Sequence, residues 1–313
     1  MKAIYYHKAD LDGVLSGVIA NYYCINRNIL EEIILVPVDY GDDFEKTFYY
    51  YQEKGENKRL EDCDVIYVLD ISDDVFFNDE RFRNKIIWID HHITAIEKNY
   101  RVNQYCVNGV AACRLTFQFF RDPSNHVFYT EDTYRNRLVT EPLFVTLAGE
   151  YDIWDHRSEY SIFLNFGIQD ISFKNVDFIY RQLYKILSYG SVCDDKLNID
   201  YDLTFKYITD KGKAVIDYVK QTSARMHGGS KIKLLGYNGI VFNTHIKSSF
   251  IHILQRDEDF IMVWNYDGKK IKASFYSDKI DVSQIAKKFN GGGHSGAAGC
   301  ALNLGQLLEI YGR

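Results

Sequence analysis

The sequence predicts an α/β protein with a doubly wound, mostly parallel sheet in its N-terminal part and a smaller α+β domain at its C-terminal end. Two observations carry this prediction. The first ninety residues alternate short apolar runs with segments of helical spacing, and the residues after about 225 change to strands joined by hairpin turns. A chain of 313 residues is also long enough for about two domains.

Four apolar runs define the predicted parallel sheet. They lack polar alternation, which is typical of strands that are buried on both faces. The runs are residues 3–6, 33–38, 65–69 and 86–89. Between the first two, residues 13–27 carry apolar side chains at helical spacing. This strand–helix–strand pattern is typical of a doubly wound α/β domain.

The middle of the chain is predicted to be mainly helical. Helical spacing of apolar residues occurs at 111–120, 143–148 and 176–187, and residues 202–224 are predicted as a connecting helix. We therefore expect a first domain at residues 1–200 and a connecting helix at 201–225.

The remaining residues, 226–313, are expected to form the second domain. Its predicted strands lie at residues 231–235, 239–243, 260–266 and 270–277, and its helix at 282–289. Asp267-Gly268 between the last two strands is a hairpin turn signal.

Composition and charge exclude several classes of protein. Lys and Arg total 37 against 43 Asp and Glu, a formal charge of −6, whereas a protein that coats long duplex nucleic acid needs a broad basic surface. No run of about 18 apolar residues is present, and charge follows the N-terminus too quickly for a signal peptide. The six scattered cysteines are typical of reduced thiols. We expect a cytoplasmic protein with no membrane partner.

Acidic and histidine side chains follow three of the four predicted strands. His7, Asp10 and Asp12 follow the first strand, Asp70 ends the third, and Asp90-His91-His92 ends the fourth. Because ligand sites of open parallel sheets lie outside the carboxyl ends of the strands, these residues are expected to converge.

Carboxylates and imidazoles in this number suit a pair of divalent cations. Two-metal hydrolysis needs a carboxylate that bridges the ions, and Asp70, alone at its strand end, is the natural bridge. A ligand set without thiolates favours Mn²⁺, with Mg²⁺ as the alternative. For any single Asp after a strand the alternative is a helix N-cap, and this interpretation is kept for Asp39. A further acidic cluster occupies residues 150–156.

Five motifs, in this order, resemble those of the DHH phosphoesterase family with its DHHA1 subdomain. They are His7-Lys8-Ala9-Asp10-Leu11-Asp12-Gly13, Leu69-Asp70, Asp90-His91-His92, Asp152, and Phe289-Asn290-Gly291-Gly292-Gly293-His294-Ser295-Gly296-Ala297-Ala298-Gly299. The resemblance spans nearly the whole chain and is strongest to short-oligonucleotide phosphodiesterases (nano-RNases, or oligoribonuclease-like enzymes). RecJ-type exonucleases share the motifs but are usually larger. The resemblance implies a DHH domain and a DHHA1 domain with a cleft between them.

The resemblance also implies a role for each matching residue. Two Mn²⁺ ions would share the strand-end ligands, with His7, Asp10 and Asp70 on one ion and Asp12, Asp70, His91 and Asp152 on the other. Asp90 would orient a ligand histidine, and His92 would lie near the scissile phosphate. Asp155 competes with Asp152 for the fourth motif; the alternative for Asp155-His156 is a surface pair or a cap.

The glycine run is the candidate substrate-binding element of the second domain. Gly291-Gly292-Gly293 allows a close backbone approach and offers N–H groups to a phosphate, and His294 directly after it favours substrate recognition over a flexible loop. Where family members carry an arginine in the strand before this helix, the chain has Tyr276, which would stack on a base, with Lys272 as an alternative contact. Arg114 is a further candidate cation, with a solvated helix face as its alternative.

The leading hypothesis is a Mn²⁺-dependent phosphodiesterase that hydrolyses short oligonucleotides or dinucleotides to mononucleotides by a two-metal activated water. A cyclic-dinucleotide phosphodiesterase and a 3′,5′-bisphosphate nucleotidase share the metal motifs. A family II pyrophosphatase shares only the DHH half, and a non-catalytic nucleotide-sensing module is the alternative of a different class. The expected partner is the short substrate itself, and a homodimer is left open.

Overall fold

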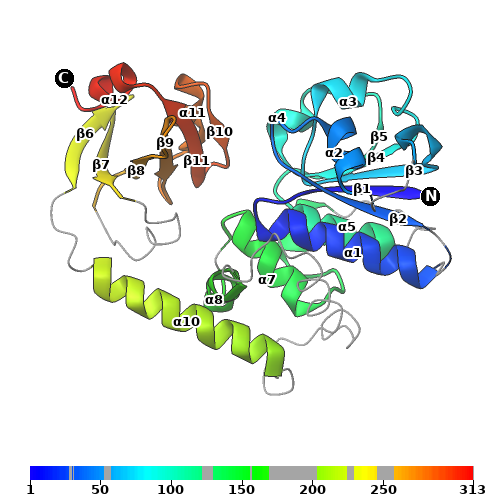
Figure 1. Cartoon of the computed structure of the whole chain (residues 1–313). Coiled ribbons are helices and arrows are strands. Elements are labelled where there is room, and N and C mark those ends of the chain that lie inside the picture. The colour runs from blue at the N-terminus through cyan, green and yellow to red at the C-terminus, as the bar shows by residue number, and fades with distance from the viewer. Residues whose placement is uncertain are drawn as a thin grey trace. The chain divides into compact units, whose positions relative to one another are not determined.

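The computed structural model describes residues 1–27, 30, 32–52, 58–121, 130–155, 157–168, 203–223, 229–244 and 257–312. The chain divides into two compact units, Met1–Asp210 and Lys211–Arg313 (Figure 1). The division falls inside the long helix α10 (Leu203–Ser223). The predicted helix at 176–187 and the expected domain border at 225 lie outside the described residues.

A parallel sheet of five strands forms the centre of the first unit. Its strand order is β2-β1-β3-β4-β5, and every neighbouring pair is parallel. The strands are β1 (Lys2–His7), β2 (Ile33–Val38), β3 (Val65–Leu69), β4 (Ile86–Asp90) and β5 (Asn103–Cys106). The first four coincide with the predicted apolar runs. The edge strand β5 was not predicted, because two of its four side chains are polar and exposed.

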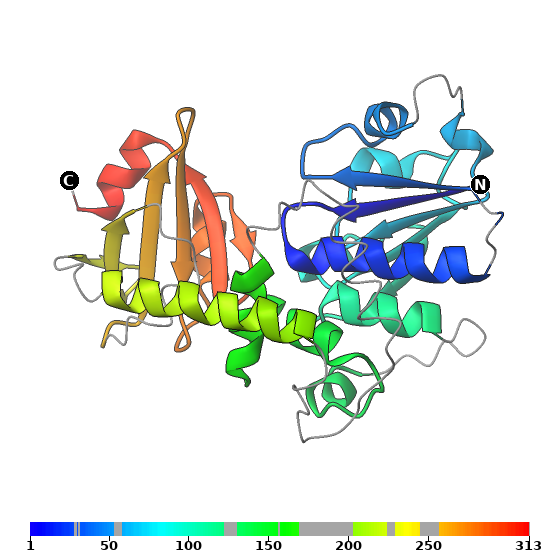
Figure 2. The ribbon, with the colours of Figure 1, turned by 60° about the horizontal axis from the view of Figure 1, so that its bottom comes forward.

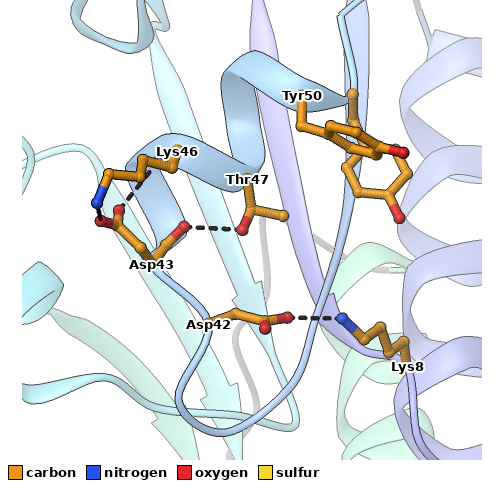
Figure 3. Close-up of a pocket in the computed structure, with 7 residues that line it drawn as sticks. Lys8, Asp42, Asp43, Lys46, Thr47 and Tyr50 are labelled. Carbon is orange, nitrogen blue, oxygen red and sulfur yellow. Dashed lines mark hydrogen bonds and ion pairs between the residues drawn. The ribbon is translucent and has the colours of Figure 1, made fainter.

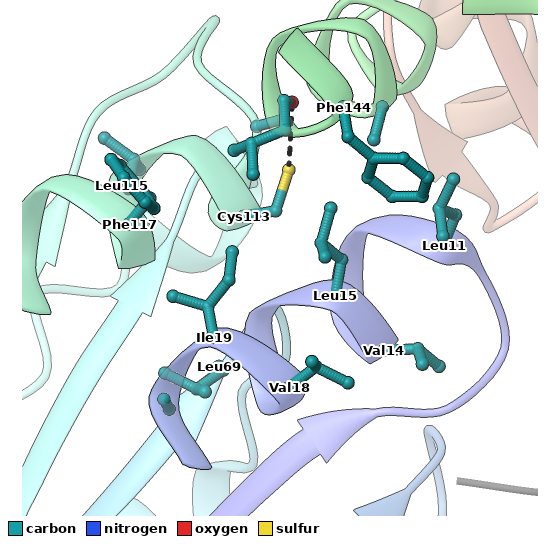
Figure 4. Packing of buried hydrophobic residues seen from close by; sticks show 14 of the residues in the cluster. Leu11, Val14, Leu15, Val18, Ile19, Leu69, Cys113, Leu115, Phe117 and Phe144 are labelled. Carbon is teal, nitrogen blue, oxygen red and sulfur yellow. Dashed lines mark hydrogen bonds between the residues drawn. The ribbon is translucent and has the colours of Figure 1, made fainter. Parts of the chain in front are cut away.

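Helices cover both faces of this sheet. One face packs against α1 (Leu11–Arg27), α5 (Ala112–Arg121), α7 (Leu143–Asp152) and α8 (Glu159–Ile168), and Figure 4 shows the apolar side chains of the first three meeting there. The other face packs against α2 (Phe44–Tyr50), α3 (Asp74–Asn78) and α4 (Ile93–Ile96). Two short helices, η1 (Leu60–Asp62) and α6 (Glu131–Arg135), also belong to this unit. The doubly wound α/β prediction is confirmed.

The two cores explain the continuous apolar runs. Along β1, Ile4 and Tyr6 belong to the core under α1, whereas Ala3 and Tyr5 belong to the core under α2. Because successive side chains of a strand point to opposite faces, a strand buried on both faces needs apolar residues at every position. Figure 2 shows α1 running along this sheet.

The second unit contains a mixed sheet of six strands in the order β10-β11-β9-β8-β7-β6. The strands are β6 (Ser230–Leu234), β7 (Tyr237–Asn243), β8 (Phe260–Tyr266), β9 (Ile271–Tyr276), β10 (Gly292–Gly293) and β11 (Ala297–Leu302). Only β7 and β8 are parallel. The helices α11 (Ser283–Lys288) and α12 (Leu304–Ile310) share one apolar core with the sheet. The last two strands were not predicted, because their glycine and alanine residues give no strand signal.

Candidate metal centre

The strand order places a ligand site at one edge of the first sheet. β1 lies between β2 and β3, so the connections from β1 diverge, and in this order the ligand crevice opens at the carboxyl ends of β1 and β3. His7 is the last residue of β1, Asp70 directly follows β3, and Asp90 is the last residue of β4. The three predicted strand ends therefore converge.

The first cluster of candidate ligands, here the β1 group, consists of His7, Asp10 and Asp70. Their ligand atoms lie within 4.8 Å of one another. The Nδ1 atom of His7 is 3.2 Å from Oδ2 of Asp10 and 3.6 Å from Oδ2 of Asp70. Asp70 has a φ of 59°, a left-handed conformation that Asp and Asn tolerate better than most residues. The structure therefore holds the Asp70 carboxylate in place with an uncommon backbone turn.

The second cluster, here the β4 group, consists of Asp12, His91 and Asp152. The Nε2 atom of His91 lies 3.5 Å from Oδ2 of Asp12 and 3.2 Å from Oδ2 of Asp152. The same nitrogen is 3.3 Å from Oδ1 of Asp70. Asp70 thus presents one oxygen to each group, which is the arrangement expected of a bridging carboxylate.

Two of these carboxylates also cap helices. Asp10 accepts a hydrogen bond from the Gly13 backbone N–H at 3.0 Å, at the start of α1. The two oxygens of Asp12 accept 2.8 Å hydrogen bonds from the backbone N–H groups of Ala112 and Cys113, the first residues of α5. The N-cap alternative and the ligand interpretation are therefore not exclusive, and capping fixes where the Asp12 carboxylate lies.

Asp90 contacts both of the histidines that follow it. Its Oδ1 accepts from the backbone N–H groups of His91 and His92 at 2.6 and 3.1 Å and lies 2.8 Å from Nδ1 of His92. Its Oδ2 accepts from Nε1 of Trp88 at 3.1 Å. Asp90 therefore fixes the backbone of both histidines and contacts the ring of His92. Its role in orienting a ligand histidine stays a prediction.

Buried charge dominates the site. Burial raises the pKa of Asp152 to about 7 despite the nearby His91. Burial opposes the charged form of His7, but the carboxylates of Asp10 and Asp70 outweigh it and raise the pKa of His7 to about 11. Burial likewise lowers the pKa of His92, yet Asp90 raises it to about 9. The pKa values of Asp152, His7 and His92 are therefore all raised at the place where several carboxylates lie close together.

Three buried atoms indicate what the site lacks. Within the described ranges, Nδ1 of His7, Oδ1 of Asp70 and Oδ2 of Asp152 have no hydrogen-bond partner. Buried polar atoms without partners are costly, so each is expected to bind something. Three carboxylate or imidazole atoms at one sheet edge match the oxygen and nitrogen ligands that divalent cations prefer, and these residues fit a metal site.

Sequence reasoning missed two residues of this site. Asp39 does not cap the following helix, because Asp43 does so through the Lys46 backbone N–H. Instead Oδ1 of Asp39 lies 3.3 Å from Nε2 of His7. The ring of Tyr40 meets the His7 ring edge-on, with centroids 5.4 Å apart. The signal that could have identified Asp39 is its position directly after β2, the strand beside β1.

The structure places two further candidates outside the cluster. Asp155 pairs with Arg157 at 2.9 Å, whereas Asp152, three residues earlier, contacts His91. Arg114 is 1% exposed and forms a 2.5 Å ion pair with Glu141. Both the solvated face and the substrate contact expected of Arg114 are therefore wrong, since its guanidinium is used inside the core. His156 lies outside the described residues.

The glycine run forms an edge strand and a tight turn. Gly292 and Gly293 pair with β11, and His294 closes a turn with Ala297 through reciprocal backbone hydrogen bonds of 2.8 and 3.2 Å. A Cβ at Gly291 would lie 2.1 Å from a backbone oxygen, whereas a Cβ at Gly292 would meet no atom within 4 Å. Packing thus explains Gly291 but leaves the absence of a side chain at Gly292 without a structural reason.

Tyr276, at the position where members of the family that the chain resembles carry an arginine, is mostly buried. Tyr276 is 8% exposed and lies at the end of β9, so little of its ring remains for a base to stack upon. The stacking expected of Tyr276 is therefore corrected. Lys272 lies on the same strand and forms a 3.2 Å ion pair with Asp267.

Comparisons with known proteins agree with this architecture. Residues 246–311 match the DHHA1 domain. The chain is 24% identical to an uncharacterized protein of Acanthamoeba polyphaga mimivirus, over 96% of this chain and 67% of that protein. It is 22% identical to oligoribonuclease NrnB of Bacillus subtilis, over 99% of this chain and 75% of that protein. RecJ from Thermus thermophilus, solved in complex with Mn²⁺, shares the fold with a TM-score of 0.50 and 12% identity, over 99% of this chain and 51% of RecJ.

Three independent features now agree. The first unit has a parallel sheet with His and Asp motifs at its carboxyl edge, and the second unit carries the DHHA1 match and the glycine run. The mimivirus and Bacillus relatives both align with nearly the whole chain. The second unit therefore carries a match to the DHHA1 domain, and nearly the whole chain is similar to an oligoribonuclease.

Proposed function

We propose that this protein hydrolyses the phosphodiester bonds of short oligonucleotides or dinucleotides, releasing mononucleotides, with two divalent cations held at the sheet edge. The observation that carries the proposal is the pair of ligand groups that meet at Asp70. One of its oxygens lies 3.6 Å from His7 of the β1 group and the other lies 3.3 Å from His91 of the β4 group. The similarity to an oligoribonuclease supports the substrate class.

The residues divide into two ligand sets. We assign His7, Asp10 and Asp70 to one cation, and Asp12, Asp70, His91 and Asp152 to the other. Asp39 is added as a neighbour of His7. The oxygen and imidazole donors favour Mn²⁺, with Mg²⁺ as the alternative. Divalent cations in these positions supply charge neutralisation at the phosphoryl group and lower the pKa of the attacking water.

We assign proton transfer to His92. Its Nδ1 lies 2.8 Å from Oδ1 of Asp90, and Asp90 raises the pKa of the ring to about 9, so the imidazole is protonated at neutral pH. A protonated, oriented histidine can donate its Nε2 proton to the leaving ester oxygen as the water oxygen bonds to phosphorus. One proton of the water stays on the new phosphate monoester, and the other restores the His92 imidazolium. The P–O ester bond breaks, and the products are an alcohol and a phosphate monoester.

The substrate is proposed to be short. A net charge of −6 leaves little basic surface to hold many phosphates, so activity should be highest on two- to five-nucleotide substrates. Gly291, Gly292, Gly293 and His294 stay proposed substrate contacts of the second unit. The exclusion of long duplex nucleic acid is proposed on the same ground of charge. A cytoplasmic location is proposed because the six scattered cysteines are typical of reduced thiols. No helix in the described part of the chain is both long and apolar enough to cross a bilayer.

A turnover panel tests the proposal. The purified protein is incubated with Mn²⁺ and, separately, a linear dinucleotide, a pentanucleotide, a cyclic dinucleotide, a 3′,5′-bisphosphate nucleotide and pyrophosphate. We expect mononucleotides from the linear substrates and none after chelation. Preferred release of phosphate from pyrophosphate or the bisphosphate, or no turnover of any linear substrate, would contradict the proposal. A preference for the cyclic substrate would mean that the same site hydrolyses cyclic dinucleotides.

Two neighbouring carboxylates provide a matched control. Asp152→Asn removes a group 3.2 Å from His91 and is expected to abolish turnover. Asp155→Asn removes a carboxylate that pairs with Arg157 on the same stretch of chain and is expected to retain it. Equal losses in both variants would mean that the α7 end matters for folding alone.

A further inference from the structure

A pocket of about 390 Å³ lies beside the metal centre in the first unit. It is lined by Lys8, Asp42, Asp43, Lys46, Thr47, Tyr50 and Tyr51, here called the tyrosine pocket. Figure 3 shows the Lys8–Asp42 ion pair below the helix that carries Lys46, Thr47 and Tyr50. This volume is in the range of pockets that hold small ligands, which is about 300–1,000 Å³.

The tyrosine pocket is joined to the β1 group by short contacts. Lys8 directly follows His7 at the end of β1. Asp42 accepts hydrogen bonds from Lys8 Nζ at 2.6 Å and from the Asp39 backbone N–H at 2.9 Å. Asp39 in turn reaches His7 at 3.3 Å. A substrate with its phosphate at the metal centre therefore has this pocket as an immediate neighbour.

The aromatic side chains of the pocket do not serve the core. α2 packs inward through Phe44 and Phe48, whereas Tyr50 is 80% exposed. The rings of Tyr50 and Tyr51 meet edge-on, with centroids 5.1 Å apart. Tyr40, against the His7 ring, is 58% exposed. Exposed aromatic faces of this kind are the surfaces on which single-stranded bases stack.

The cations of the pocket retain donors for a phosphate. Lys8 and Lys46 each pair with one carboxylate, at 2.6 Å to Asp42 and 2.7 Å to Asp43. An ammonium group has three N–H donors, so a single carboxylate does not use them all. Because each lysine is already balanced by an aspartate, the pocket is close to neutral, and aromatic stacking rather than charge is expected to provide most of its affinity.

We propose that the tyrosine pocket is a subsite for the next nucleotide of a single-stranded substrate, one position away from the phosphate that is cleaved. The base stacks on the face of one of the two rings, Tyr50 or Tyr51, and contacts the other at its edge, because the rings are nearly perpendicular. Lys8 and Lys46 donate hydrogen bonds to the adjoining phosphate. This inference rests on the proposed function and extends it. It accounts for activity on substrates longer than a dinucleotide, since the volume of the pocket suits one further nucleotide.

Kinetics on two substrate lengths test the subsite. The Tyr50→Ala/Tyr51→Ala double variant should lower the ratio of kcat/KM on a pentanucleotide to kcat/KM on a dinucleotide by about tenfold, as the loss of base stacking would. Tyr50→Phe/Tyr51→Phe keeps both rings and should retain the ratio. Tyr207→Ala, which removes a 69% exposed tyrosine on α10, is the matched surface control. Lys46→Ala should lower the ratio by a smaller factor.

A binding measurement separates this inference from the proposed function. Fluorescence anisotropy of a labelled pentanucleotide in EDTA reports binding without turnover. Weaker binding by the double alanine variant than by the wild type and the Tyr207→Ala control would support the subsite, even if the wild type cleaved no linear substrate. Unchanged binding together with an unchanged length ratio would overturn it, as would equal losses of kcat/KM on both substrate lengths.

Discussion

Replacing the bridging carboxylate is the perturbation whose effect can be worked out most fully from the structure. Asp70→Asn keeps the size of the side chain and the left-handed backbone, since Asn tolerates a φ of 59° as well as Asp does. It removes one negative charge from both ligand groups at once. Two unit charges about 4 Å apart in an effective dielectric near 20 interact by about 4 kcal/mol, and the double charge of Mn²⁺ raises this to about 8 kcal/mol. The neutral amide oxygen of Asn recovers part of this energy, and a remaining loss of about 4 kcal/mol corresponds to about a thousandfold lower affinity.

The assay is calorimetric titration of Mn²⁺ into the metal-free variant, with circular dichroism as the control for folding. We expect about a thousandfold weaker Mn²⁺ binding and no measurable turnover, with native secondary structure retained. Two equivalents of Mn²⁺ bound at wild-type affinity, or near-normal hydrolysis, would refute the assignment of Asp70 as the bridge.

The remaining predictions concern the glycine run, the protons of the candidate metal ligands and the buried ion pair. Gly291→Ala should destabilise the protein by about 1–3 kcal/mol, because the new Cβ would lie 2.1 Å from a backbone oxygen, whereas Gly292→Ala should keep the melting temperature and lower kcat/KM. Thermal unfolding of both variants checks this, and equal melting temperatures would contradict it. Mn²⁺ affinity should rise as the pH passes through about 7 and should go on rising above it. Burial raises the pKa of Asp152 to about 7, the carboxylates raise that of His7 to about 11, and both protons must leave before the cations bind. A pH-independent affinity in calorimetry would count against this. Arg114→Met should lower the free energy of unfolding in urea by about 3–5 kcal/mol, because it leaves Glu141 buried without its cationic partner. The loss should be largely recovered in Arg114→Met/Glu141→Leu. A single variant as stable as the wild type would show that the ion pair is not structural.

The parallel sheet could be predicted because strands that are buried on both faces appear in the sequence as continuous apolar runs. Ile4 and Tyr6 serve one core and Ala3 and Tyr5 the other, so the run contains no polar residue. The same topology makes strand ends converge, which is why His7 and Asp70 could be brought together without coordinates.

Residues whose neighbours are distant in sequence could not be assigned in this way. Arg114 lies within an apolar helical segment, and the sequence gives no sign that Glu141 pairs with it inside the core. Asp39 has the pattern of an N-cap, yet a second aspartate four residues later takes that position. A pattern can name the residue types a site needs, but the pairing of each charge depends on the tertiary contacts.

The carboxylate of Asp12 can cap a helix and serve as a candidate metal ligand at the same time. Asp12 accepts two backbone N–H groups from the start of α5, about a hundred residues away, while Oδ2 also faces His91 at 3.5 Å. Sequence reasoning treated the two roles as alternatives. The structure shows why they coincide: a carboxylate at a helix N-terminus is fixed in orientation, which suits a ligand that must be held in place.

The central claim is that two divalent cations share Asp70 at the edge of the parallel sheet. Anomalous diffraction from crystals of the protein soaked in Mn²⁺ tests it directly. The account predicts two peaks about 3.5–4 Å apart, one beside His7 and the other beside His91, with the Asp70 carboxylate between them. A single peak, or two peaks that do not touch Asp70, would contradict it.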